Sequence, residues 1–241
     1  MGKMGRGEGV GNMMELVQRW TLDGKTVSVY GGAGPVIYLP AGGQDMSALC
    51  QALIAAGCLP VTLAAVAGLE WDRDLTPWPA PAVYRKSGSF SGGAEDFLAQ
   101  LTARIIPVVE QALAARPPWR GLAGYSLGGA FALWAAWQSS CFARVASVSG
   151  SLWYPGLVDA LCACPPDGAM KRVYFSLGDR ECRARNPALQ TVQAQTERLC
   201  AHCRSLGVET VFRLHPGGHF HQPEQRMAAA IAWLAAAEPL P

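Results

Sequence analysis

The sequence lacks any run of about 18 apolar residues, the length that a membrane-spanning helix needs. It also has little charge, because charged residues make up 16% of the 241 residues and the net charge is +2, without a basic stripe. We therefore expect neither a membrane nor a nucleic acid among its partners. Half of the residues are hydrophobic, which is typical of one α/β domain with a large core.

The first residues also lack the apolar core of a signal peptide. Residues 1–13 are glycine-rich and polar, and we expect them to form a disordered extension before a single domain over 14–241. This predicts a cytoplasmic protein, in which the eight cysteines are reduced. The spacing of the cysteines does not match a common zinc site, so we expect no metal or other cofactor.

Predicted strands and helices alternate along most of the chain. The strands are expected over 15–22, 25–30, 35–39, 59–66, 119–123, 145–148, 172–177 and 208–214. The helices are expected over 46–56, 94–116, 130–137, 186–206 and 222–237, with a long irregular stretch over 68–93. This order predicts an α/β fold, with a mostly parallel central sheet and helices on both faces.

Residues 124–129 read GYSLGG, which matches the nucleophile elbow of serine hydrolases. A tight turn between strand and helix would place Ser126 at the helix N-terminus, where backbone N–H groups favour a developing negative charge. Gly124 and Gly128 are expected where any side chain would clash with the neighbouring strand or helix. The alternative is an ordinary serine in a glycine-rich turn.

A nucleophilic serine needs a base, and the chain has four histidines. His219 lies in a loop between the last strand and the last helix, in the order serine, acid, histidine that hydrolases of this kind require. We predict His219 as the base, with His215 and His221 as alternatives. His202 falls in a predicted surface helix.

The base needs an acid that orients it. Glu181 and Asp179 share a loop after the strand at 172–177, at the edge of the sheet where α/β sites form. Glu181 is the favoured acid because it follows Gly178 at a G-x-x-[D/E] spacing, and Asp179 is the alternative. A serine–histidine pair without an acid, or another carboxylate such as Asp159, is also left open. The carboxylate that is not used is expected to form a salt bridge with a nearby arginine: Arg180, Arg183 or Arg185.

An oxyanion hole should use two backbone N–H groups. One is expected from Leu127, directly after the serine, and the other from Ala41 or Gly42 in the loop after the strand at 35–39. The alternative for that loop is a plain glycine turn.

The long stretch over 68–93 is expected to cover the substrate. Its candidate aromatic and cationic contacts are Trp71, Trp78, Tyr84, Phe90, Arg73, Arg85 and Lys86. Trp78 and Arg85, together with Trp153 from the segment after the strand at 145–148, are the predicted substrate contacts. The alternative is that the tryptophans pack the loop down and the charges face solvent.

The GYSLGG elbow is followed by SGSLWY at 149–154, SLGDRE at 176–181 and GGHF at 217–220. In this order, over residues 14 to 237, the motifs resemble the esterase branch of the α/β-hydrolases. That branch includes esterase D (S-formylglutathione hydrolase), feruloyl esterases, mycolyltransferases and ferric enterochelin (siderophore) esterases, and the chain is most similar to the last.

The resemblance implies an α/β-hydrolase fold and the cleavage of carboxylic esters through an acyl-serine. The substrate would be a siderophore-type ester or another small to medium ester, and no cofactor is implied. An acyltransferase or thioesterase on the same serine, histidine and acid is the alternative, and a non-catalytic binding protein on the same fold is a third reading. The motifs do not specify the oligomeric state.

Overall fold

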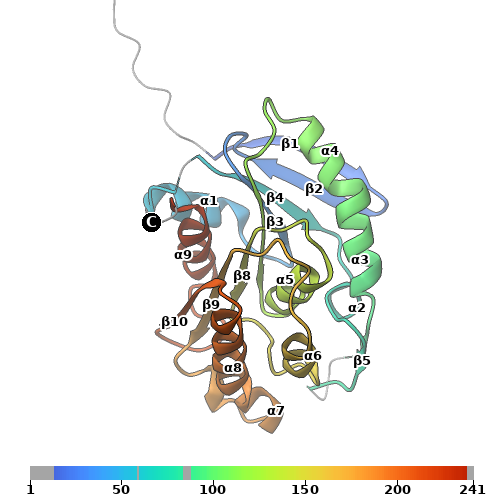
Figure 1. Ribbon diagram of the computed structural model, residues 1–241. Helices are drawn as coiled ribbons and strands as arrows, with labels where there is room; N and C mark the ends of the chain where they lie inside the picture. Colours follow the sequence, from blue (N-terminus) through green and yellow to red (C-terminus); the bar gives the residue numbers. More distant parts are fainter. Residues whose placement is uncertain (1–13, 59, 84–87, 238–241) are drawn as a thin grey trace, which may run out of the picture.

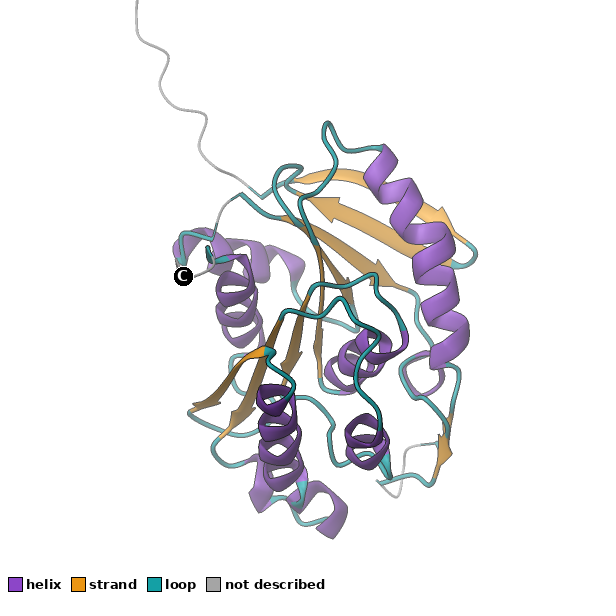
Figure 2. Ribbon diagram, in the orientation of Figure 1, coloured by secondary structure: helices purple, strands orange, loops and turns teal. Residues whose placement is uncertain are grey.

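An eight-stranded mixed sheet forms the framework of the residues that the structure describes (Figures 1 and 2). The structure is a computed structural model and describes residues 14–58, 60–83 and 88–237, so the expected extension over 1–13 lies outside the described residues. The strand order is β1-β2-β4-β3-β7-β8-β9-β10. The strands are β1 (Leu16–Leu22), β2 (Lys25–Tyr30), β3 (Val36–Pro40), β4 (Thr62–Ala67), β7 (Arg120–Tyr125), β8 (Arg144–Val148), β9 (Arg172–Gly178) and β10 (Glu209–His215).

The sheet is parallel from β4 to β10 and antiparallel at the β1–β2 end. The hairpin between β1 and β2 turns at Asp23 and Gly24, which both have positive φ angles (46° and 80°), as a two-residue hairpin turn of the primed type requires. Because the parallel strands run the same way, their carboxyl ends lie along one edge of the sheet. The prediction of a mostly parallel sheet is confirmed.

Helices cover both faces of this sheet (Figure 2). The α-helices of the described residues are α1 (Met46–Ala55), α2 (Trp71–Asp74), α3 (Ala94–Gln100), α4 (Ile106–Gln111), α5 (Leu127–Gln138), α6 (Leu157–Ala163), α7 (Pro187–Gln190), α8 (Val192–Ser205) and α9 (Pro223–Ala235). Helices α1 and α9 pack on one face with Ile37 and Leu39 of β3, whereas α3 to α6 and α8 share a core with Val36 and Tyr38. Successive β3 side chains enter different cores because they alternate along a strand.

The helix expected over 94–116 is shorter and less regular than predicted. Helix α3 passes into a π-helical turn, η1 (Leu101–Ile105), before α4 begins, and α4 ends at Gln111. Pro107 lies in the first turn of α4, where its missing N–H group is tolerated. The π-helical turn ends directly before α4, so Pro107 falls at the start of a helix and not in the interior of one long helix.

Other boundaries also differ from the prediction. The helix expected over 186–206 is divided at Thr191 into α7 and α8, and the short helix α6 was not predicted. The stretch over 68–93 is not wholly irregular, because it contains α2 and a small sheet of β5 (Pro79–Ala80) and β6 (Phe90–Ser91). Within the described ranges, no helix is long and apolar enough to cross a bilayer.

Candidate active site

Ser126 lies in a strained turn between β7 and α5. Its backbone has a φ of 58° and a ψ of −124°, a conformation that costs a non-glycine residue about 1–3 kcal/mol. The turn is held from both sides, because the Ser126 N–H donates to Val148 and the Ser126 carbonyl accepts from Gly129 and Ser151 at 3.0 Å each. This is the strand–turn–helix geometry that exposes a serine at the edge of a sheet.

The glycines of the elbow are needed at 124 and 129 rather than at 124 and 128. A Cβ atom at Gly124 would lie 2.1 Å from the backbone of Gly128, and one at Gly129 would lie 2.9 Å from the Gly124 carbonyl oxygen. A Cβ at Gly128 would meet nothing nearer than 3.6 Å, so the predicted reason for this glycine is wrong. It is the Gly128 backbone, not a side chain, that lies against β7.

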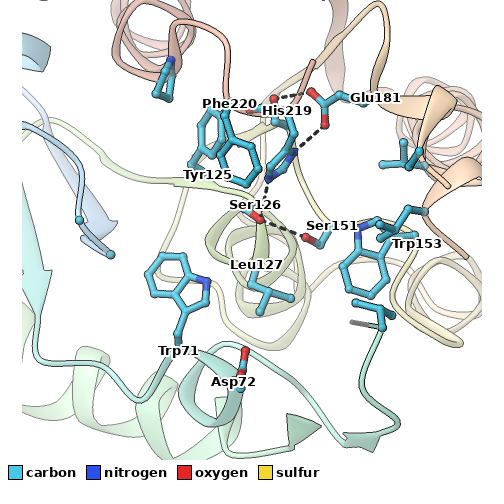
Figure 3. Close-up of a pocket in the computed structure, with 18 of the residues that line it drawn as sticks. Trp71, Asp72, Tyr125, Ser126, Leu127, Ser151, Trp153, Glu181, His219 and Phe220 are labelled. Carbon is cyan, nitrogen blue, oxygen red and sulfur yellow. Dashed lines mark hydrogen bonds and ion pairs between the residues drawn. The ribbon is translucent and has the colours of Figure 1, made fainter. Parts of the chain in front are cut away.

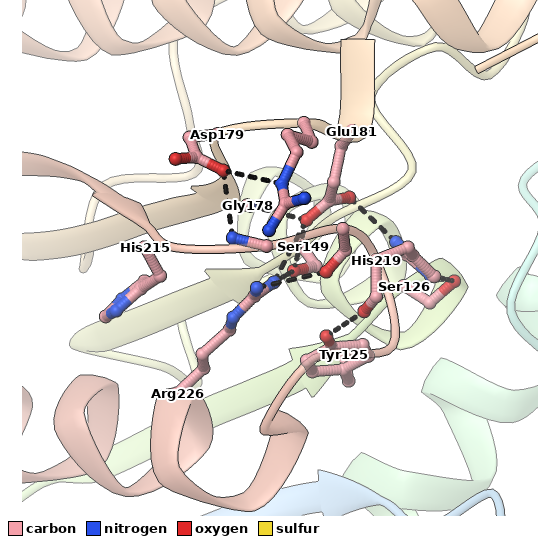
Figure 4. A network of polar contacts seen from close by, with 12 residues as sticks. Tyr125, Ser126, Ser149, Gly178, Asp179, Glu181, His215, His219 and Arg226 are labelled. Carbon is pink, nitrogen blue, oxygen red and sulfur yellow. Dashed lines mark hydrogen bonds and ion pairs between the residues drawn. The ribbon is translucent and has the colours of Figure 1, made fainter. Parts of the chain in front are cut away.

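The structure brings the three predicted residues Ser126, His219 and Glu181 together (Figures 3 and 4). His219 comes from the loop between β10 and α9, and Glu181 from a 3₁₀ turn, η2 (Glu181–Arg183), after β9. The His219 Nε2 atom lies 3.0 Å from Ser126 Oγ, and His219 Nδ1 lies 2.7 Å from Glu181 Oε2. Each contact is within hydrogen-bond distance, so the three side chains form a continuous relay.

Glu181 is buried but surrounded by donors. Its second oxygen, Oε1, accepts from the Gly178 N–H at 2.6 Å, from Ser149 Oγ at 2.7 Å and from Arg226 Nη1 at 3.2 Å. Burial raises the pKa of Glu181, but the hydrogen bonds from His219, Gly178 and Ser149 outweigh it and hold the pKa below its ordinary value. An ionised Glu181 accepts from Nδ1–H, which leaves Nε2 to accept the Ser126 hydroxyl proton.

Asp179, the alternative acid, does not contact His219. Its side chain is 53% exposed and lies 3.7 Å from Arg180, one of the arginines expected to pair with the unused carboxylate. Its Oδ1 atom accepts the Gly217 N–H at 2.8 Å. Asp179 therefore anchors the loop that carries His219 but does not reach the imidazole ring (Figure 4).

The alternative histidines lie elsewhere. His215 Nε2 is 3.3 Å from the Tyr174 hydroxyl, and burial, with Arg226 and Arg213 nearby, lowers its pKa. The His221 ring covers Gly217, where a Cβ would lie 2.6 Å from it. Neither has a hydrogen bond to Ser126.

Of the two oxyanion donors predicted in the loop after β3, only one remains a candidate in the structure. The Ala41 N–H donates to the Val66 carbonyl at 2.8 Å, which extends the β3–β4 ladder, so Ala41 is not available as a donor. Gly42 lines the cavity, and its N–H donates to Gln44 Oε1 at 2.6 Å. The Leu127 N–H begins α5 and has no acceptor among the described residues. Gly42 and Leu127 thus remain the candidates.

Ser126 opens into a cavity of about 480 Å³, within the usual range for small-molecule sites. The polar residues that line the cavity include Gly42, Gln44, Asp72, Ser151, His219 and Glu224. The apolar residues that line it include Trp71, Val83, Phe90, Leu127, Trp153, Ala184, Leu189, Val192 and Phe220. Trp153 therefore lies where the sequence analysis expected a substrate contact.

Trp78 does not line this cavity, contrary to the prediction. Its indole N–H donates to the Pro155 carbonyl at 2.9 Å, and its ring packs against Tyr154, with centroids 6.2 Å apart. Trp78 thus fastens the stretch over 68–93 to the segment after β8. Arg73 is also outside the lining and pairs with Asp74 and Asp96, whereas Tyr84, Arg85 and Lys86 lie outside the described residues.

Sequence reasoning missed Arg226, a buried arginine of α9. It donates to Ser149 Oγ at 3.0 Å as well as to Glu181, and it donates to the carbonyls of Pro216 and Gly218 at 3.0 Å each. One guanidinium therefore joins the acid to the loop that carries His219 (Figure 4). One feature of the sequence could have indicated its role: Arg226 lies near the start of a predicted helix, where the helix dipole disfavours a positive charge.

Replacing Arg226 with Met should destabilise the protein by about 3–5 kcal/mol, because a buried carboxylate loses its partner and two carbonyls lose a donor. The matched control is Arg198→Met on α8, since the Arg198–Asp159 pair is exposed and should contribute at most about 1 kcal/mol. Urea unfolding of both variants measures the difference. Equal losses in the two variants would show that the buried network adds no stability.

The strained serine between β7 and α5, on a mostly parallel sheet covered on both faces, defines an α/β-hydrolase. The model of the family described as "Putative esterase" matches residues 25–223, which is most of the chain. The chain therefore belongs to this family and is a carboxylic ester hydrolase of the serine type.

The chain is also similar to individual proteins. YbbA, an uncharacterized protein of Bacillus subtilis (strain 168), is 27% identical over 177 residues, which cover 70% of each chain. The solved structure of the enterobactin hydrolase IroE in complex with DFP is 26% identical, with a TM-score of 0.68 over 88% of this chain and 90% of that one. An IroE-like serine hydrolase from Shewanella oneidensis has a TM-score of 0.74 at 17% identity, over 90% of this chain and 78% of that one.

Proposed function

We propose that the protein hydrolyses small to medium carboxylic esters through an acyl intermediate on Ser126. The observation that carries this proposal is the relay of Ser126 Oγ, His219 and Glu181, with contacts of 3.0 Å and 2.7 Å. His219 Nε2 takes the hydroxyl proton as Oγ attacks the ester carbonyl, and Glu181 holds the ring and stabilises the imidazolium. His219 then gives the proton to the leaving alcohol.

The second half of the reaction uses the same groups. His219 removes a proton from water, the hydroxide attacks the acyl carbonyl, and the C–Oγ bond breaks as Ser126 regains its proton. In both halves the carbonyl oxygen becomes negative, and the N–H groups of Leu127 and Gly42 are the proposed donors to it. In the free enzyme Gln44 Oε1 accepts from Gly42, so the substrate oxygen must replace this amide oxygen.

The substrate is proposed to carry an apolar or aromatic group. The lining residues Phe90, Leu127 and Trp153 support this, because burying an apolar part of the substrate against them is favourable. A siderophore-type ester is one candidate, since the enterobactin hydrolase IroE is among the similar structures. Among the described lining residues outside the relay, the charged ones are Asp72 and Glu224, so the aromatic feature is supported better than an anionic one.

A cytoplasmic location is also proposed. It is supported by the eight cysteines, which are all free and which a reducing compartment keeps as thiols.

A fluorophosphonate probe followed by intact-mass measurement tests the proposal on the wild type, alongside turnover of p-nitrophenyl acetate and butyrate. We expect one adduct, mapped to Ser126, and slower labelling of His219→Ala because the hydroxyl then lacks its base. A folded wild type that takes no adduct would reject the proposal and favour a binding protein. Faster product release on adding an alcohol or thiol, with the acyl group found on it, would favour the acyltransferase alternative.

A further inference from the structure

The Trp71 side chain lies between the loop after β3 and the first turn of α5, which follows the proposed nucleophile. It is the first residue of α2, in the stretch over 68–93, and its ring lies against Gly42 so closely that a Cβ there would be 2.2 Å from the ring. A Cβ at Gly128, on the elbow side, would be 3.6 Å from the same ring. Gly42 is therefore required because Trp71 covers it, whereas the ring leaves room for a methyl group at Gly128.

The indole N–H group is directed into the cavity. In Figure 3 the nitrogen of Trp71 lies on the ring edge that faces Ser126 and Leu127, and the side chain is part of the cavity wall. Within the described part of the chain, this N–H has no hydrogen-bond acceptor. Trp78, in the same stretch, provides a contrast, because its N–H donates to the Pro155 carbonyl at 2.9 Å.

An N–H group here has a specific use in the proposed reaction. When a serine attacks an ester, the carbonyl oxygen gains a full negative charge, and donors already aimed at that charge need no reorganisation. The Gly42 N–H is occupied by Gln44 Oε1 in the free enzyme, whereas the Trp71 N–H is open to the cavity. A rigid aromatic ring also excludes water from the same oxygen, which strengthens each remaining hydrogen bond.

We propose that the Trp71 side chain donates its Nε1–H to the oxyanion, as a third donor beside the N–H groups of Leu127 and Gly42. This role rests on the proposed function, and it assigns a side chain to a task for which the sequence suggested only backbone groups. Trp71 is then a catalytic residue supplied by the stretch that covers the substrate.

Trp71→Phe tests this role, because phenylalanine keeps an aromatic ring against Gly42 but has no N–H. We expect kcat for p-nitrophenyl acetate to fall about 10- to 100-fold while KM changes less than about 2-fold, since the donor acts mainly on the transition state. Trp78→Phe is the matched control. It also loses an indole N–H, but outside the cavity, and should keep kcat within about 2-fold.

Two inhibitors separate a lost donor from a disturbed fold. A trifluoromethyl ketone that adds to Ser126 carries an oxyanion, and its methyl ketone counterpart binds without forming one. In Trp71→Phe the first should weaken about as much as kcat falls, and the second should be unchanged. Equal weakening of both inhibitors, or wild-type kcat, would overturn the role of Trp71. Failure of the proposed function itself would be recognised differently, as a wild type that neither turns over esters nor takes the fluorophosphonate.

Discussion

Ser126→Ala is expected to lower kcat for p-nitrophenyl esters by about 10⁴- to 10⁶-fold and to abolish labelling by a fluorophosphonate. The Oγ atom lies 3.0 Å from His219 Nε2, so its loss removes the atom that is proposed to form the acyl bond. Alanine has the same steric difficulty as serine at a φ of 58°, and the turn keeps its backbone hydrogen bonds. The folded structure should therefore survive, which a melting temperature close to that of the wild type would verify.

Ser151→Ala is the matched control, because Ser151 is the other hydroxyl next to the nucleophile. Its Oγ lies 3.4 Å from Ser126 Oγ, and both line the cavity. Among the described residues, the Ser151 hydroxyl has no hydrogen bond to a base, so its alanine variant should still be labelled at Ser126. If Ser151→Ala lost the label while Ser126→Ala kept it, the assignment of the elbow serine as nucleophile would be wrong.

The three residues of the relay could be predicted from the sequence because each of them follows a predicted strand. Ser126, Glu181 and His219 come after β7, β9 and β10, and parallel strands direct their carboxyl ends to one edge. The GYSLGG pattern also predicted the tight turn, because glycines on both sides of a serine between a strand and a helix are typical of such a turn. The preference for Glu181 over Asp179 depended on a spacing of three residues from Gly178, whose N–H in fact donates to Glu181.

The features that sequence reasoning missed depend on contacts between distant segments. Trp71 meets Gly42 and Arg226 meets Glu181 only after the sheet has formed, and no local pattern encodes those approaches. Ala41 was a candidate oxyanion donor because its neighbours are glycines, but the Val66 carbonyl uses its N–H. The helix end predicted at residue 116 was also wrong, because α4 ends at Gln111 although the alanine-rich residues after it have high helix propensity.

Glu181→Gln should lower kcat by about 10³- to 10⁴-fold, because a neutral amide neither stabilises the imidazolium nor enforces the tautomer in which Nδ1 carries the proton. Asp179→Asn is the matched control. Its amide oxygen still accepts the Gly217 N–H, so kcat should change less than about 3-fold. Near-UV circular dichroism of both variants checks the fold. A large loss in Asp179→Asn, with none in Glu181→Gln, would reverse the assignment of the acid.

The lowered pKa of Glu181 adds a second, independent readout. In the folded state this carboxyl stays ionised below the ordinary pKa of about 4.3, so the unfolded state binds more protons in that range. The stability that Glu181 contributes is therefore complete above about pH 4.3 and is lost as the pH falls through the lowered pKa. Urea midpoints at pH 7, 4 and 3 should fall more steeply in the wild type than in Glu181→Gln. Parallel curves would mean that the donors around Oε1 do not stabilise the charge, and the same donors would then be unable to keep Glu181 ionised beside His219.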